Sequence, residues 1–528
     1  MQLLAFLFFT GLVALGTYLI IRNKEDKTEE GYFLGGRSLT GPVIAGSLLL
    51  TNLSTEQIVG LNGAAFREGI LVAAWEILAA IAIVFTAVYL LPKYLKLGIA
   101  TIPQFLEDRF DTATKSLTSA VFLAGYGLIL LPIVLYSGAL ALSTMFHVDK
   151  VFGISQSAAL WLTVWAIGIV GSIYAIFGGL RAVAVSDTLN AIGLFTGGLL
   201  IPVFGLLTLG KGHILRGLSL LYKSHPEKFN IIGGPEASVP FATIFTGMML
   251  VQIFYWGTNQ AIIQRALGSK NLKEGQKGLI LASLGKIFVP IIVVLPGIIA
   301  YQYFNGHLDN PDRAYPMLVN AVLPPVFVGF FAAVIFGAIL SSFNSALNSA
   351  VTLFGLDIYK TYINKNATED RVVKVGKTFG TFLALMAMFI APLIAKAPKG
   401  LFAYLQEVNG FYNIPILTII AVGLFSKRIP AVAAKTGLIS GIVLYAISQF
   451  GLKYYFGPEH YPHYLHVMAI LFVFNTLLMI IIGKFHPTDK PYQIHYTRKV
   501  DIKPWPLVNI AGIFVVLVVI SIYIIFSQ

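Results

Sequence analysis

Polar side chains interrupt several long apolar stretches of this sequence, and they are the groups best able to bind an ion or a small solute. The first set lies in residues 47–57, where Asn52, Glu56 and Gln57 follow a run of leucines. Such a segment is a poor continuous helix. If it unwinds, its freed carbonyls can ligate a small hard cation, and its amides and carboxylate can hydrogen-bond hydroxyl groups. A polar contact between helices is the alternative interpretation.

A second set lies in residues 338–349. Ser341 and Ser342 are adjacent there, and neutral hydroxyls that face unwound carbonyls suit sodium, which takes several oxygen ligands. Small residues also let helices approach closely, so plain packing is the alternative. The polar residues that share one helix face, at spacings i, i+3, i+4, i+7 and i+8, are Ser341, Asn344, Ser345, Asn348 and Ser349.

Two further sets combine aromatic rings with amides and charges, which is the equipment that holds a sugar. Tyr255 begins the segment 255–260, and Lys286 lies inside the next apolar run. A buried lysine needs an acceptor, and Glu76 is the intramembrane acid that we expect beside it. Gln406 belongs to the fourth set. Structural hydrogen bonding within the protein is the alternative for these residues.

Asp187 stands at the start of another apolar stretch, near the predicted cytoplasmic face. It is a candidate to ligate or guide sodium as the ion leaves. The alternative is a carboxylate at a helix start, where the helix dipole favours negative charge.

These residues must be positioned by membrane helices. The chain has 528 residues, of which 57% are hydrophobic and 12% charged, and its apolar runs have the length of about 20 residues that one helical crossing requires. We therefore predict an all-α polytopic membrane protein that forms one membrane domain. About fourteen spans are expected, near residues 3–21, 41–64, 69–92, 118–144, 156–177, 183–209, 239–258, 278–303, 325–354, 377–395, 401–425, 431–450, 464–483 and 506–526.

Basic residues set the predicted orientation. Of the 37 Lys and Arg, 26 fall in one set of alternate loops and ten in the other, and the richer set is expected in the cytoplasm. Both termini would then lie outside the cell, and the membrane would be the plasma membrane or the inner membrane. Topology also explains the net charge of +13 without a nucleic-acid partner. The chain has no Cys, and its His residues lie in loops or near span ends, which disfavours thiol chemistry and an intramembrane metal centre.

Several blocks of this sequence are similar, in order, to signatures of the solute:sodium symporter family, and within that family to the bacterial sodium/galactose carriers. The resemblance runs from residue 32 through the twelfth span. The blocks that carry it are YFLGGRSL at 32–39, NLSTEQ at 52–57, GGLR at 178–181, YWGTNQAIIQR at 255–265 and VLPG at 294–297.

The resemblance implies the leucine-transporter fold, in which two five-helix inverted repeats are flanked by further helices. The repeats would occupy residues 41–209 and 239–425 within a transport core of 41–425. Residues 1–40 would form the first helix and a cytoplasmic loop, and 426–528 the C-terminal helices. By the same resemblance the second and seventh spans are broken near mid-membrane, where such folds bind their ligands.

The resemblance also assigns site residues. For sodium it implies the carbonyls of Leu50, Leu53 and Ala338 with the oxygens of Ser341 and Ser342. Where the galactose carriers have polar residues, this sequence has Leu130 and Ala79, and Gln252 stands in place of an Asn, so galactose itself need not be the substrate. The substrate-site residues that carry over are the contacts Gln57, Glu76, Lys286 and Gln406, with Asn52 nearby and Tyr255 as the inner aromatic gate.

We therefore expect a secondary active transporter that couples sodium influx to uptake of a sugar, a hexose or a related sugar, by alternating access. The co-transported sodium ion, the sugar and the lipid bilayer are its partners. The nearest alternative is a sodium symporter for another solute, such as myo-inositol or a substituted or acidic sugar, because Lys286 can hold an anion. An intramembrane enzyme would need a nucleophile–base pair or a metal cluster that this sequence does not offer, and a channel or sensor would not accumulate its solute.

Overall fold

The computed structural model describes residues 1–21, 29–396, 401–457 and 459–527. Helices form nearly all of this part, which has no strand beyond one bridge between Leu39 and Ser269. The α-helices of the N-terminal half are α1 (Gln2–Ile21), α2 (Glu29–Leu34), α3 (Gly41–Asn52), α4 (Thr55–Glu68), α5 (Ala74–Phe85), α6 (Leu91–Leu97), α7 (Ile102–Arg109), α8 (Thr112–Gly125), α9 (Leu131–Phe146), α10 (Val148–Phe152), α11 (Gln156–Leu209) and α12 (Ile214–Ser224).

The C-terminal half repeats this all-helical pattern. Its helices are α13 (Phe241–Thr243), α14 (Met249–Gly257), α15 (Gln260–Leu267), α16 (Leu272–Phe288), α17 (Pro290–Val293), α18 (Leu295–Tyr303), α19 (Ala314–Val322), α20 (Pro325–Thr352), α21 (Glu369–Ile390), α22 (Leu401–Phe425), α23 (Ala431–Ala446), α24 (Lys453–Phe456), α25 (Tyr464–Phe485) and α26 (Val508–Phe526).

The number of spans is close to the predicted fourteen. Among the described residues, 11 helices are long and apolar enough to cross a membrane, or 13 if each of two bent pairs counts as one span. The difference comes from the second predicted span, because α3 is too short to cross a membrane by itself and is separated from α4. The polytopic all-α prediction is confirmed, and the break explains the lower number.

The break between α3 and α4 falls inside the segment that the sequence marked as a poor helix. Leu53 has φ −74° and ψ 51°, and Ser54 is extended, with φ −78° and ψ 175°. Ser54 then precedes α4 as its N-cap, a position where serine is common, although its side chain forms no capping hydrogen bond with the described residues. Leu49 still accepts from the amide of Leu53 at 2.7 Å, but the carbonyls that follow Leu49 in α3 lose the helical donors four residues ahead. The chain thus places free carbonyl oxygens inside the membrane domain.

A second break separates α14 from α15, and the two helices are bent by 47°. Gly257 ends α14, and the side chain of Asn259 caps α15 by accepting a hydrogen bond from the amide of Ala261 at 3.0 Å. The seventh predicted span is therefore broken, as the resemblance implied. A third bend, of 41°, separates α16 from the segment 290–303.

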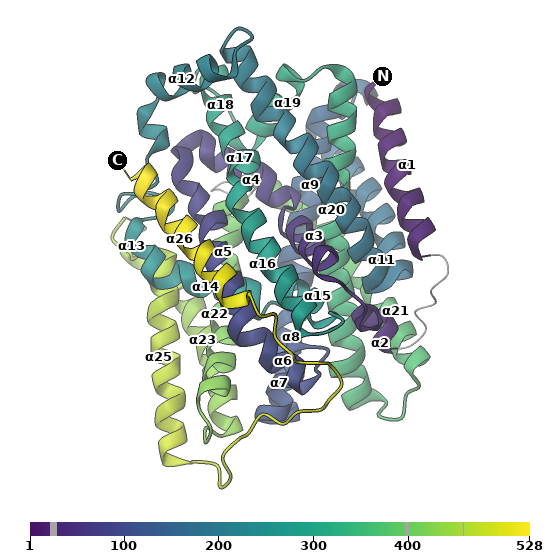
Figure 1. Cartoon of the computed structure of the whole chain (residues 1–528), viewed down its shortest axis with the longest axis vertical. Helices are drawn as coiled ribbons and strands as arrows, with labels where there is room; N and C mark the ends of the chain where they lie inside the picture. The colour runs from purple at the N-terminus through teal and green to yellow at the C-terminus, as the bar shows by residue number, and fades with distance from the viewer. Residues whose placement is uncertain (22–28, 397–400, 458, 528) are drawn as a thin grey trace.

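The broken helices lie at the centre of the molecule (Figure 1). α3 packs against α11, α16 and α20, while α5 packs against α14 and α16. α1 lies along one flank against α20, and α23 and α25 pack together at the other flank. The side chains of residues 20–30, 32 and 174–184, and with them Tyr32 and the block at 178–181, lie outside the described part. The loop predicted after the first helix falls largely there as well.

Candidate functional site

A closed polar cavity lies where the two broken spans meet. It has a volume of about 50 Å³, and α3, α4, α5, α14, α20 and α22 contribute to its wall. The polar and aromatic residues that line it are Thr51, Asn52, Glu56, Gln57, Trp75, Glu76, Gln252, Tyr255, Trp256, Asn259, Ser342, Ser345, Gln406, Asn409, Tyr412 and Asn413.

Lys286 and Glu76 form a buried ion pair, as expected from the sequence. The ammonium group of Lys286 donates to the Glu76 carboxylate and to Oδ1 of Asn52, and it lies 5.5 Å from the centre of the Trp256 ring. Lys286 is 0% exposed and Glu76 1%. Glu76 and Asn52 line the cavity, whereas Lys286 lies behind them. Lys286 therefore supports the two lining residues Glu76 and Asn52.

Gln57, Gln406 and Tyr255, which the resemblance assigned to the substrate site, all line the cavity. Within the described part of the chain, Oε1 of Gln57 is buried without a hydrogen-bond partner, and so is Oδ1 of Asn413 in the same wall. Buried polar atoms are rarely left unpaired in a finished core. Acceptors of this kind, beside aromatic rings, are suited to the hydroxyls and C–H faces of a polyhydroxylated solute.

The positions that depart from the galactose carriers have different environments. Leu130 lines the cavity, whereas Ala79 is buried outside it. Gln252 lines the cavity, and its Nε2 donates to the carbonyl of Trp75 at 2.6 Å. The amide nitrogen of Gln252 is thus engaged in joining α14 to the segment before α5.

The predicted sodium residues lie on facing elements at the α3–α4 break. Ser342 donates to the carbonyl of Thr51 at 3.0 Å, and the hydroxyls of Ser341 and Thr51 are 3.5 Å apart. Ala338 lies one turn before Ser342 on the same buried helix. The remaining predicted ligands, the carbonyls of Leu50 and Leu53, flank Thr51 at the end of α3. Hydroxyl and carbonyl oxygens of this kind are the ligands that hard cations prefer.

Asp187 is fully buried beside this break and is not an exposed helix-start carboxylate. Its Oδ2 accepts from Ser47 at 2.8 Å and from Thr51 at 3.4 Å, and it lies 3.7 Å from Nη2 of Arg265. Its Oδ1 has no hydrogen-bond partner among the described residues. Because Thr51 contacts both Asp187 and the serines of α20, the carboxylate is placed to act on an ion at the break.

Arg265 is a residue of the site that the sequence did not single out. It was counted among the cytoplasmic basic residues, but it is 1% exposed, because α15 is the second half of a broken span. Its guanidinium donates to Ser47 at 2.9 Å, to the carbonyl of Ala261 and to Ser345. The signal available in the sequence was an arginine two residues after the apolar run Ala261–Ile263.

An aromatic contact closes the cavity toward the predicted outer side. The rings of Trp75 and Phe402 meet edge to face, with centroids 5.4 Å apart. Beyond them lies a vestibule of about 600 Å³, which shares Trp75 with the cavity and is also lined by Arg67 and Asp312. Burial raises the pKa of Asp312, whose carboxylate accepts from the amide of Leu401 at 3.0 Å. This bond holds the start of α22, which carries Phe402, in place.

Phe402→Ala is expected to loosen this outer closure. An edge-to-face aromatic pair contributes about 0.5–1.5 kcal/mol beyond its burial, so labelling inside the cavity should accelerate roughly three- to tenfold. The measurement is the rate at which a membrane-impermeant thiol reagent labels Gln406→Cys, in a chain that has no other cysteine. Phe245→Ala, at a ring that is 75% exposed, is the control and should leave the rate unchanged. Equal rates in Phe402→Ala and the parent would contradict a gate at this contact.

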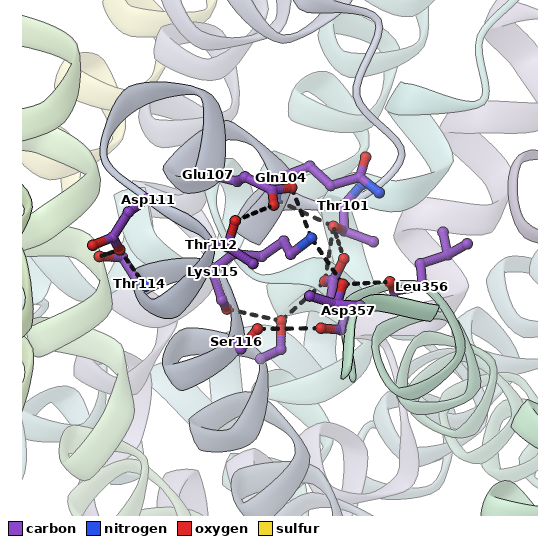
Figure 2. A network of polar contacts seen from close by, with 12 residues as sticks. Thr101, Gln104, Glu107, Asp111, Thr112, Thr114, Lys115, Ser116, Leu356 and Asp357 are labelled. Atoms are coloured by element: carbon purple, nitrogen blue, oxygen red, sulfur yellow. Dashed lines mark hydrogen bonds and ion pairs between the residues drawn. The ribbon is translucent and has the colours of Figure 1, made fainter. Parts of the chain in front are cut away.

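Toward the predicted cytoplasmic side, two polar contacts join segments that are distant in sequence. The hydroxyl of Tyr126 donates to Asn259 at 2.8 Å, directly beside the cavity. Further in, the carboxylate of Asp357 accepts from Thr101 at 3.0 Å (Figure 2). It also accepts from Ser119 at 2.9 Å. Ser116 donates to the Asp357 carbonyl at 3.2 Å. This network was not predicted from the sequence, because its members belong to three segments that are distant in the chain.

Broken helices that meet at a polar cavity, closed at both ends within a membrane bundle, define a secondary transporter. The model of the sodium:solute symporter family matches residues 32–441. The chain belongs to the sodium:solute symporter family: it is a multi-pass membrane protein that moves a small solute together with sodium, and it is not an enzyme.

Known relatives match along nearly the whole chain. The uncharacterized symporter YidK of Escherichia coli (strain K12) is 48% identical over 99% of this chain and 90% of its own length. The sodium/glucose cotransporter of Vibrio parahaemolyticus is 31% identical over 96% of this chain and 95% of its own. Among solved structures, the substrate-bound outward-open state of a Na⁺-coupled sialic acid symporter covers 93% of this chain and 99% of its own, with a TM-score of 0.76 and 20% identity. This last likeness confirms the fold.

Proposed function

We propose that this chain takes up a sugar, a hexose or a related polyhydroxylated solute, by coupling it to sodium influx across the cell membrane. The observation that carries the proposal is the cavity itself, in which unpaired acceptors such as Oε1 of Gln57 lie beside Trp75 and Tyr255. The relative from Vibrio parahaemolyticus, a sodium/glucose cotransporter, supports a sugar. Asn52, Gln57, Glu76, Tyr255 and Gln406 would contact it, and Lys286 would orient Glu76 and Asn52.

Sodium would bind at the α3–α4 break, between α3 and the serines of α20. In the proposed cycle, sodium binds first and holds α3 against α20, which preorganises Asn52 for the sugar. Closure at Trp75 and Phe402 follows, and the inner contacts then open to release both ligands, with sodium passing Asp187. The coupling requires only that each ligand binds one conformation more tightly than the other. A membrane potential of 100 mV contributes about 2.3 kcal/mol per sodium charge.

The orientation and domain limits belong to the same proposal. Both termini would lie outside the cell, because the basic loops are expected in the cytoplasm. The inverted repeats would occupy 41–209 and 239–425, with residues 1–40 before them and 426–528 after them. The two observed breaks fall at corresponding places, near the start of each repeat. This is where inverted-repeat transporters place their binding sites.

The test is uptake into proteoliposomes. Labelled glucose, galactose, myo-inositol, glucosamine and glucuronate would each be offered with an inward sodium gradient, and with an equal potassium gradient as the control. We expect one or more neutral members of the panel to accumulate only with sodium. If no sugar or polyol moves under either gradient, the sugar assignment is wrong, although family membership stands.

A further inference from the structure

The central cavity has an unbalanced charge. Among the described residues that line it are two carboxylates, Glu56 and Glu76, and no Lys, Arg or His. Glu76 is neutralised from behind by Lys286. Glu56 forms no ion pair with a described residue, and its Oε2 is buried without a hydrogen-bond partner. The residue is 5% exposed, so this carboxylate belongs to the cavity wall and not to an open surface.

Two opposing effects act on the charge of Glu56: burial without a counter-charge among the described residues disfavours the ionised form, whereas the backbone at the start of α4 favours it. Glu56 lies in the first turn of the 14-residue helix α4, directly after the break at Leu53 and Ser54. Amide groups at a helix N-terminus point toward this turn, and the helix dipole stabilises negative charge there. The break that exposes carbonyls for sodium therefore also places a carboxylate at the cavity wall.

The nearby cations are already engaged. Lys286 donates to Glu76 and Asn52. Arg265 donates to Ser47 and Ser345 and is paired with Asp187. Neither cation lines the cavity. An anionic solute would consequently meet Glu56 without a counter-charge, and like charges in a poorly hydrated site repel strongly.

We propose that Glu56 is a specificity-determining residue that keeps anionic solutes out of the central cavity. The transported solute is then neutral or cationic, for example a hexose, a cyclic polyol or an amino sugar. Its polyhydroxylated nature rests on the proposed function, whereas the charge selectivity belongs to the cavity alone. The acidic sugar that the sequence left open is thereby disfavoured, because its only support was Lys286, which the structure places behind Glu76 and Asn52.

A cysteine reporter tests this selectivity without any sugar. Gln406→Cys places a single thiol in the cavity wall of a chain that has no cysteine. Its labelling rates with a cationic and an anionic methanethiosulfonate of similar size are measured and divided by the rates at Ser157→Cys, an exposed position. We expect the normalised rate of the cationic reagent to exceed that of the anionic one, and Glu56→Gln to reduce this ratio by about tenfold.

Two matched variants keep the test sharp. Glu56→Asp retains the charge and should retain most of the preference, while Glu236→Gln removes an exposed carboxylate and should leave the ratio unchanged. A ratio near one in the parent, or one that Glu56→Gln does not alter, would overturn the proposal. Because no sugar takes part, this result is independent of the uptake panel: a cavity that selects cations while no sugar is transported would refute the sugar assignment alone.

Discussion

Lys286→Met is expected to abolish solute binding and to lower the free energy of unfolding by about 3–5 kcal/mol, because removing one partner of a buried ion pair leaves the other charge uncompensated. Here the stranded group is the carboxylate of Glu76, which is 1% exposed. Asn52 would also lose its donor. The measurement combines unfolding of the purified protein in detergent with binding of the solute that the uptake panel identifies.

The double variant Lys286→Met, Glu76→Gln separates stability from binding. It removes both charges, so most of the lost stability should return while binding stays absent. Lys374→Met is the matched control, because Lys374 and Asp370 form a pair in which each side chain is 67% exposed, and exposed pairs contribute about 0–1 kcal/mol. If the Lys286→Met protein were as stable as the parent, Lys286 would not be what neutralises the buried carboxylate of Glu76.

Ser342→Ala is expected to raise the sodium concentration for half-maximal uptake by on the order of 10- to 100-fold, since an interaction with a charged partner is typically worth about 1.5–3 kcal/mol. Ser342 is the hydroxyl that contacts the carbonyl of Thr51 at the α3–α4 break. Ser349→Ala is the matched control: it lies on the same helix, is equally buried, and donates to Gln264 at 2.8 Å. Unchanged sodium dependence in Ser342→Ala would refute the sodium site.

Local sequence could predict the break at residues 52–55, because Asn, Ser and Thr there favour caps over helix interior. It could also predict the partnership of Lys286 with Glu76, because a buried lysine has few possible acceptors. It could not predict that Lys286 lies behind the cavity wall. That placement depends on how α16 is rotated against α3 and α5, which residue spacing within one helix does not determine.

The contacts that close the cavity could not be predicted from the sequence, for a related reason. Trp75 and Phe402 belong to helices that are distant in the chain. In the sequence, neither residue differs from the many other aromatic residues of membrane helices. Asp357 likewise finds its hydroxyl donors on other segments. The sequence placed Arg265 in a cytoplasmic loop, because the predicted span ended before α15. In the structure α15 is the second half of that broken span. Each of these features exists only through tertiary contact.

The sodium and solute sites are expected to be coupled through the end of α3, where Thr51 contacts Ser342 and the adjacent Asn52 contacts Lys286. The most direct test measures solute affinity with and without sodium, and sodium affinity with and without solute, on the purified protein. Coupling in binding free energy is reciprocal, so both ligands should gain the same factor, on the order of 5- to 150-fold. A solute affinity that does not change with sodium would contradict the account.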